Sequence, residues 1–219
     1  MQEFLGVKFE IIINTRTKHG FVKYNPHGYL SFCFPKYMKN KINLAQEYIT
    51  NNSAKIPKIF EKQIRRDHNF QKNIQAYIQS HPNKLIVFGM EHNINDLSIE
   101  SLTQMLYTKS LMIINEFVEI MNLHYSKLII SYTKGYLGQC KGDIIKIDYR
   151  NVLCELDLLR YLIVHELSHL RYRNHSKQFW NEVATYYPQY KIARKELKIV
   201  ANRNAEILKY YDLLPSKLH

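Results

Sequence analysis

The 219-residue sequence contains few cysteines and no long hydrophobic run. Its three cysteines, Cys33, Cys140 and Cys154, are odd in number and include no Cys-x-x-Cys pair, so a separate zinc ribbon is not expected. A reduced, cytoplasmic protein is the simplest interpretation. No stretch of about 18 uninterrupted apolar residues occurs, and we therefore expect no membrane-spanning helix.

The first twenty residues also lack the features of a secretory signal. Glu3 comes early, and no basic segment precedes the short apolar run that follows. Internal repeats and low-complexity tracts are absent as well. With a hydrophobic content of 46%, the chain is typical of a globular protein, and its length allows one domain with a sizeable core.

Acidic residues are scarce relative to basic ones, and the net charge is +12. Such a charge suits nucleic acid, an anionic membrane face or an acidic substrate. Lys, Asn, Ile and Tyr are all abundant, however, as in a chain encoded by AT-rich DNA, so charge alone gives little support to a nucleic-acid partner. We expect Arg65-Arg66 to form a solvated face, whereas Arg171, Arg173 and Lys177 could flank a cleft.

The most informative stretch is LRYLIVHELSHLRYRNHSKQFW, residues 159–180. It contains the pattern HExxH, formed by His165, Glu166 and His169. Residues four apart on an α-helix lie on one face, so the two imidazoles can bind one Zn²⁺ at ~2.0–2.1 Å each. Zinc lowers the pKa of a bound water toward ~7. Glu166 can then accept the proton of that water as a general base.

The residues before the motif predict that this helix is buried. They are apolar on nearly all sides: Leu156, Leu158, Leu159, Leu162, Ile163 and Val164. The alternative to a metal site is a core helix whose histidines hydrogen-bond to their neighbours. Burial of two histidines and a glutamate on one apolar helix is costly unless they are paired, and a bound metal removes that cost.

The third ligand is predicted from the turn after the motif. A catalytic zinc usually has three protein ligands and one open position for water. Asn174 tolerates the left-handed conformation found at helix ends, and Ser176 is a suitable N-cap for a helix over residues 177–187. His175 would lie in the corner between the two helices. Glu182, on the second helix, is the alternative ligand. His175 is favoured because it lies in a turn next to the motif, closer to the metal.

These residues resemble the YgjP-like zinc metallopeptidases, whose pattern reads approximately HELxHLxxxxHSxxFWxxVxxxxPxY. The matching positions are His165-Glu166-Leu167, His169-Leu170, His175-Ser176, Phe179-Trp180, Val183, Pro188 and Tyr190. The resemblance implies that His165, His169 and His175 bind zinc and that Glu166 is the general base. It fades after about Leu197.

Upstream, the same family carries an Arg-Trp-Gly-Ser-Cys segment followed by a short strand. This chain has Tyr136-Leu137-Gly138-Gln139-Cys140 at that place, followed by Gly142. Gly138, Cys140 and the later glycine match, but the arginine and the tryptophan do not. Whatever those two side chains do in relatives is therefore not carried over.

Hydrophobic periodicity predicts an α+β fold. Strands are expected over residues 7–13, 21–24, 29–34, 84–88, 127–132 and 144–148. Residues 21–34 should form a β-hairpin that turns at residues 25–28, whereas residues 91–97 look like a loop. Besides the metal helix, helices are expected over residues 41–56, 57–79, 98–122, 177–187 and 189–211.

We expect one zincin-like domain over residues 1–197, with an N-terminal β-hairpin, a small mixed sheet, the buried HExxH helix and C-terminal helices. Residues 198–219 would be a helical extension with no assigned role. By analogy with zincins, strand 127–132 or strand 144–148 could hold an extended peptide by β-augmentation.

The predicted activity is zinc-dependent hydrolysis of peptide bonds in a peptide or protein substrate. Catalysis also requires an oxyanion partner, for which Tyr172, Tyr186 and Tyr187 are candidates. Two alternatives stay open: a metal-dependent hydrolase of a phosphate-containing substrate, and a zinc-stabilised basic module that binds nucleic acid. Imidazole also accepts Mn²⁺, Co²⁺ and Ni²⁺.

Overall fold

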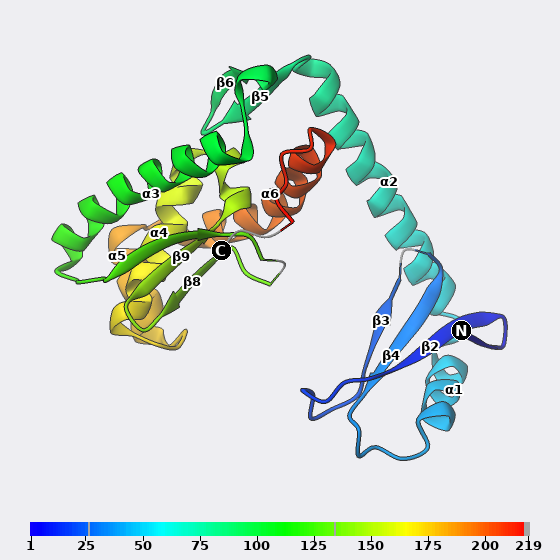
Figure 1. Cartoon of the computed structure of the whole chain (residues 1–219). Coiled ribbons are helices and arrows are strands. Elements are labelled where there is room, and N and C mark those ends of the chain that lie inside the picture. The colour runs from blue at the N-terminus through cyan, green and yellow to red at the C-terminus, as the bar shows by residue number, and fades with distance from the viewer. Residues whose placement is uncertain (26, 134, 217–219) are drawn as a thin grey trace. The chain divides into compact units, whose positions relative to one another are not determined.

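The computed structural model of the chain describes residues 1–25, 27–133 and 135–216 (Figure 1). Contacts divide the chain into two compact units, Met1–Gln75 and Ala76–His219. The predicted division at residue 197 stays a prediction, and the last three residues of the predicted extension lie outside the described part. No described helix is long and apolar enough to cross a membrane.

The first unit contains a four-stranded sheet in the order β1-β2-β4-β3, formed by β1 (Gln2–Phe4), β2 (Val7–Ile13), β3 (Phe21–Tyr24) and β4 (Tyr29–Phe34). Strands β3 and β4 are antiparallel, as predicted for the hairpin, although Pro26 in its turn lies outside the described residues. Strand β2 pairs with β4 in parallel. Phe32 and Phe34 of β4 are buried in a core cluster with Ala45 and Ile49.

Two helices follow, α1 (Lys41–Asn52) and α2 (Ile56–Ser80), and the last residues of α2 belong to the second unit. The helix predicted over residues 41–56 ends earlier than expected, because Ile56 begins α2 and is buried in the core with Phe9, Phe32 and Ile49. Arg65 and Arg66 are exposed on α2, in keeping with a solvated face.

The second unit begins with a hairpin of β5 (Lys84–Val87) and β6 (Met90–Asn93), followed by a short 3₁₀ turn, η1 (Ile94–Asp96). The prediction of a loop from residue 91 was therefore wrong for β6. The turn between β5 and β6 was not predicted, because Phe88 adopts φ 51°, a conformation that is uncommon for residues other than glycine. Its ring is buried, which offsets the strain of that conformation.

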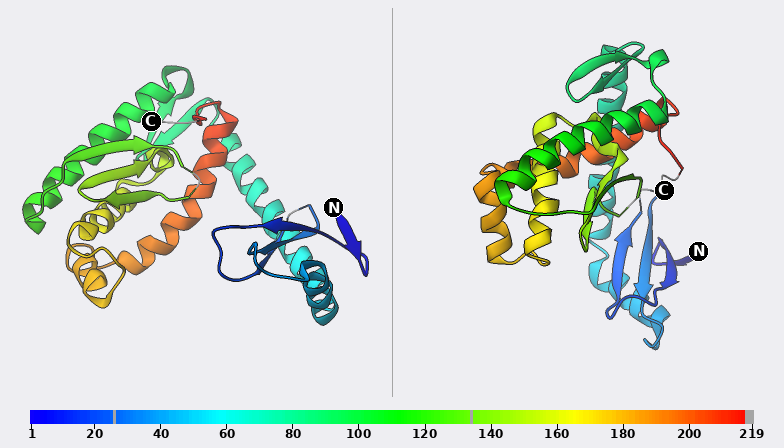
Figure 2. Two further views of the ribbon diagram at one scale, coloured as in Figure 1. Left: turned by 60° about the horizontal axis from the view of Figure 1, so that its bottom comes forward. Right: turned by 60° about the vertical axis from the view of Figure 1, so that its left-hand side comes forward.

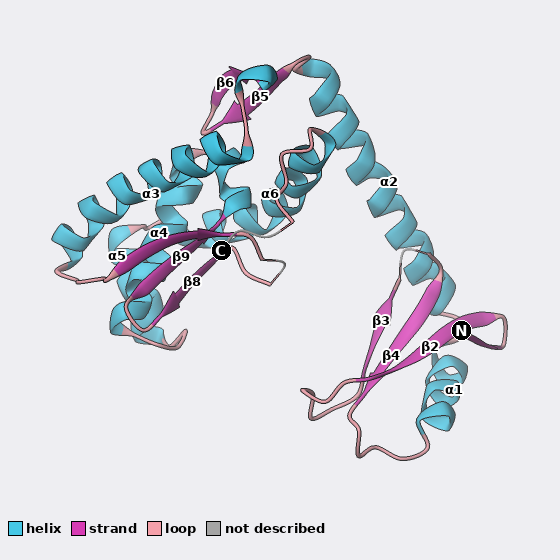
Figure 3. Ribbon diagram, in the orientation of Figure 1, coloured by secondary structure: helices cyan, strands magenta, loops and turns pink. Residues whose placement is uncertain are grey.

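Helix α3 (Ile99–Met121) and a three-stranded sheet form the centre of this unit. Ser98 caps α3 through a capping box with Ser101, and Asn122 ends it in the left-handed conformation. The strands are β7 (Lys127–Ser131), β8 (Gly138–Lys141) and β9 (Ile144–Asp148), in the order β7-β9-β8. β8, which periodicity did not predict, is thus an edge strand (Figure 3).

The remaining elements are η2 (Tyr149–Leu153), α4 (Leu156–Arg171), α5 (Lys177–Tyr186) and α6 (Tyr190–Tyr210). Helix α4 packs against α3, β8, α5 and α6, and Figure 2 shows it, in yellow, next to the sheet. Its apolar residues are buried on most sides, as predicted. The expected α+β fold is confirmed, and its most enclosed helix carries the HExxH motif.

Candidate metal centre

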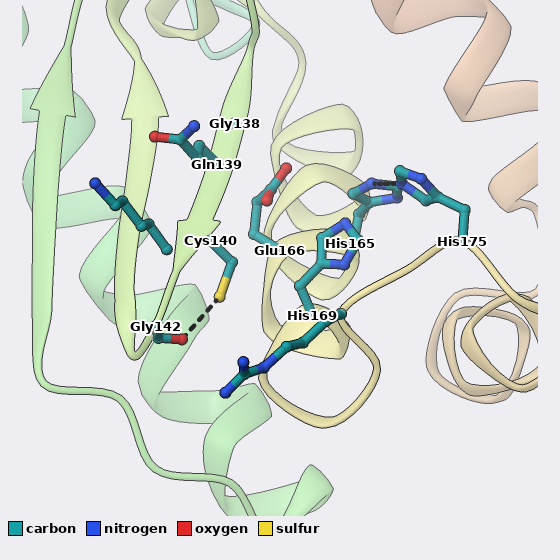
Figure 4. A pocket seen from close by; sticks show the side chains of 10 residues that line it. Gly138, Gln139, Cys140, Gly142, His165, Glu166, His169 and His175 are labelled. Carbon is teal, nitrogen blue, oxygen red and sulfur yellow. Dashed lines mark hydrogen bonds between the residues drawn. The ribbon is translucent and has the colours of Figure 1, made fainter.

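The three predicted histidines come together. His165 and His169 lie one turn apart on α4, and His175 comes from the turn between α4 and α5 (Figure 4). One nitrogen of each ring lies within 4.8 Å of the other two. The Nε2 atoms of His165 and His175 are 3.1 Å apart. Two ligands of one tetrahedral zinc ion are separated by about 3.3 Å, so this spacing suits a shared cation.

A hydrogen bond determines which nitrogen of His169 is free. Its Nδ1 lies 3.0 Å from the carbonyl oxygen of Tyr172. A carbonyl can only accept, so Nδ1 carries the proton and donates. The Nε2 atom is then left with a lone pair for a metal, an arrangement that is usual for metal-binding histidines.

The surroundings also keep the histidines uncharged. Burial, together with repulsion from His169, His175 and Arg194, lowers the pKa of His165 to about 3. Burial lowers the pKa of His169 and of His175 as well. The buried Nδ1 of His165 has no hydrogen-bond partner among the described residues. Three neutral imidazoles that converge on one point can each bind a metal ion through a nitrogen lone pair. They cannot all be paired by hydrogen bonds among themselves.

Two aromatic residues of α5 hold the rings in place. Ser176 caps α5 by accepting a hydrogen bond from the backbone N–H of Phe179 at 3.3 Å. This places Phe179 and Trp180 in the first turn. His169 stacks on Phe179 at 4.4 Å, and His175 stacks on Trp180 at 5.4 Å between ring centroids. In the segment His175-Ser176-x-x-Phe179-Trp180, the serine therefore caps the helix and the two aromatic rings stack on the histidines.

Glu182, the alternative third ligand, is engaged elsewhere. Its carboxylate forms an ion pair with Arg171. Arg171 in turn donates to the carbonyl of Met121 at 2.8 Å. Of the basic cluster expected to flank a cleft, Arg171 is thus committed to this structural contact, whereas Arg173 does line the cavity beside the histidines.

Glu166 is almost completely buried, with 4% of its surface exposed. Burial raises its pKa to about 8, although a hydrogen bond from the backbone N–H of Cys140 opposes the shift. The side chain lies against β8, where a Cβ atom built on Gly138 would be only 2.5 Å from Oε1 of Glu166. Gly138 is therefore needed for its lack of a side chain and not for backbone freedom.

A buried polar network positions the segment that leads into β8. Asp148 and Arg150 form an ion pair at 2.6 Å, and Asp148 also accepts from the backbone N–H of Thr133. Arg150 donates to the carbonyls of Thr133 and Tyr136, and Asn151 donates to that of Leu137. Asp148, Arg150 and Asn151 thus fix the position of the backbone before Gly138, and with it the distance between Gly138 and Glu166.

Two cavities open on the centre. One of about 510 Å³ lies between β8 and the histidines and is lined by Gly138, Gln139, Cys140, Lys141, Gly142 and Arg173 together with the site residues. The second, of about 350 Å³, reaches toward α6 and shares Gly138, Glu166, His165 and His175 with the first. Both cavities therefore reach Glu166 and two of the three histidines.

The predicted oxyanion partners do not line either cavity. Tyr172, Tyr186 and Tyr187 are absent from both sets of lining residues, whereas Tyr161 and Arg194 line the second cavity. Tyr161 precedes His165 by four residues, so its place on the same helix face was visible in the sequence. Arg194 lies on α6, and no local pattern linked it to the motif.

The chain was compared with known families and proteins. The model of a family described as YgjP-like, metallopeptidase domain, matches residues 36–199. Among solved structures, the metallopeptidase zymogen of Methanocaldococcus jannaschii jannalysin is 26% identical, covers 42% of this chain and 95% of its own, and has a TM-score of 0.37. That of Pyrococcus abyssi abylysin is 19% identical, with 48% and 97% coverage and a TM-score of 0.35. No curated protein matches.

Proposed function

Because this chain belongs to the YgjP-like metallopeptidase family, we propose that it hydrolyses peptide bonds with zinc held by His165, His169 and His175. The observation that carries the proposal is the convergence of the three ring nitrogens within 4.8 Å of one another. Family membership favours a peptide over a phosphate-containing substrate. Nucleic-acid binding stays a prediction.

The chemistry that zinc supplies when bound is Lewis acidity, which polarises the scissile carbonyl and makes water more acidic. The chain supplies the proton transfers. A carboxylate oxygen of Glu166 accepts a proton from the attacking water and later donates it to the leaving amine. His169 keeps its Nδ1–H on the carbonyl of Tyr172, which holds its ring in the metal-binding tautomer.

The substrate backbone is proposed to pair with β8. Among the described residues β8 pairs with no strand other than β9, and its residues Gly138–Lys141 line the larger cavity. An extended peptide that adds to the other edge, beyond the Cys140 N–H that donates to Glu166, would bring a scissile carbonyl past the histidines. The cavity lining supports β8 for this role, whereas the sequence suggested strand 127–132 or strand 144–148.

The proposal is tested by metal analysis and a peptide-library digest of the purified protein. We expect about one zinc per chain and cleavage products that disappear when a chelator removes the metal. Cleavage should return when zinc is added back, because the histidines are already held in place by Phe179 and Trp180. A metal-free protein that cleaves the library equally well would contradict the proposal.

Substitution of Gly138 tests the placement of the general base. In Gly138→Ala the new methyl group would collide with Glu166, because the Cγ, Cδ and Oε1 atoms of Glu166 lie within 3 Å of it. We expect kcat/KM to fall on the order of 100-fold, the usual effect of a displacement of about 1 Å, with zinc content unchanged.

Lys195→Ala is the control, because Lys195 is exposed on α6 and lines neither cavity. This variant should keep wild-type activity. Equal activity of the two alanine variants would show that Glu166 does not need its present position.

A further inference from the structure

The smaller cavity has an apolar wall and a basic rim. Leu137, Leu162 and Leu197 line it next to His165 and His175, and Arg194 and Lys198 complete it on the side of α6. Its volume of about 350 Å³ is ample for one amino-acid side chain. A side chain bound there would lie beside the metal centre and present its end to two cations.

The two cations lie on one face of α6, because they are four residues apart. The guanidinium carbon of Arg194 is 4.6 Å from the centroid of the Trp180 ring, the same ring on which His175 stacks. This contact holds the guanidinium near the metal centre. Among the described residues, neither Arg194 nor Lys198 forms an ion pair.

The charged residues that line the two cavities are mostly basic. Lys141 and Arg173 line the larger cavity, and Arg194 and Lys198 line the smaller one. Within the described part of the chain, Glu166 is the only acidic residue that lines either cavity, and the proposed mechanism uses it. Isolated surface cations are normally solvated and contribute little. These four surround a cleft, where low-dielectric walls concentrate their field on a bound ligand.

We propose that the smaller cavity is a carboxylate-binding subsite, so that the enzyme prefers peptides with an acidic group next to the scissile bond. This inference rests on the proposed peptidase function. Arg194 would bind the carboxylate through its guanidinium fork, Lys198 would add a second charge, and the leucines would contact the methylene groups. The carboxylate belongs either to an Asp or Glu side chain or to the peptide's C-terminus.

Paired peptides distinguish these two sources. One set carries Glu or the isosteric Gln at each position around the cleaved bond, and the other has a free or an amidated C-terminus. We expect the wild-type zinc protein to favour the carboxylate member of one set on the order of tenfold in kcat/KM. Preference in the first set indicates a side-chain subsite, and preference in the second indicates cleavage close to the C-terminus.

Variants of α6 test which residues cause the preference. Arg194→Gln combined with Lys198→Gln should bring the ratio close to one, and the corresponding Glu pair should reverse it toward Lys-containing peptides. Lys195→Glu is the matched control, because Lys195 is exposed on the same helix and lines neither cavity. An unchanged ratio in both double variants, or no preference in the wild type, would overturn the inference.

Binding separates failure of the inference from failure of the proposed function. Fluorescently labelled Glu and Gln peptides are titrated into Glu166→Gln protein, with and without the Arg194→Gln and Lys198→Gln changes. If no peptide is ever cleaved but the Glu peptide still binds about tenfold more tightly through these cations, the subsite stands and the peptidase proposal fails. Cleavage with equal binding of both peptides overturns the subsite alone.

Discussion

Glu166→Gln should retain zinc and lose peptide hydrolysis by a factor of about 10³ or more. The amide matches the carboxylate in shape, so it can occupy the same buried space against Gly138. It cannot accept a proton from water, and proton transfer by a positioned side chain contributes about 10²–10⁴-fold to such reactions. Zinc content by mass spectrometry and kcat/KM on a cleaved library peptide measure the two effects separately.

The control for this variant is Glu182→Gln. It makes the same chemical change on α5, where the carboxylate pairs with Arg171 and lines neither cavity. Activity close to that of the wild type is expected. Should Glu166→Gln remain active, the general base must be another group. Should it lose zinc, Glu166 contributes to the metal site itself.

His175→Ala should weaken zinc binding by well over 100-fold and abolish hydrolysis at limiting zinc. Loss of a residue that only hydrogen-bonds to a metal ligand typically lowers metal affinity about 10–100-fold, and loss of a ligand itself should lower it more. The Nε2 atom of His175 is 3.1 Å from that of His165, so its removal takes away one of the three converging nitrogens. Competition with a coloured zinc chelator measures the affinity.

The same measurement on Glu182→Gln decides between the two ligands that the sequence left open. If His175 completes the site, Glu182→Gln binds zinc as the wild type does and loses only the ion pair with Arg171. The opposite result, zinc retained in His175→Ala and lost in Glu182→Gln, would assign the third position to Glu182. Circular dichroism confirms that each variant is folded.

Much of this site could be predicted because it is local. His165 and His169 share a helix face through a spacing of four, and Ser176 caps the next helix so that His175 lies in the corner between them. The apolar residues around the motif predicted the burial of α4. All of these features depend on contacts within about twenty residues, where helix geometry and capping are decisive.

The features that were missed depend on long-range pairing. β8 is too short to show a period of its own and forms only because β9 offers it an edge. The turn between β5 and β6 was missed because Phe88 adopts a left-handed backbone conformation that is unfavourable for this residue type. Its ring is buried by packing that the local sequence does not show. Arg194 reaches the centre because α6 packs on α4, a contact between segments some thirty residues apart.

The order of the residues predicts the reactive groups of the proposed site, because a helix and a capped turn bring three imidazoles and a carboxylate together. The surroundings of these groups depend on how the rest of the chain packs. Packing places Glu166 against a glycine of a distant strand and brings cations of another helix to the smaller cavity. The reason is physical, because helix geometry follows from neighbouring residues, whereas burial and close approach follow from what the rest of the chain packs against.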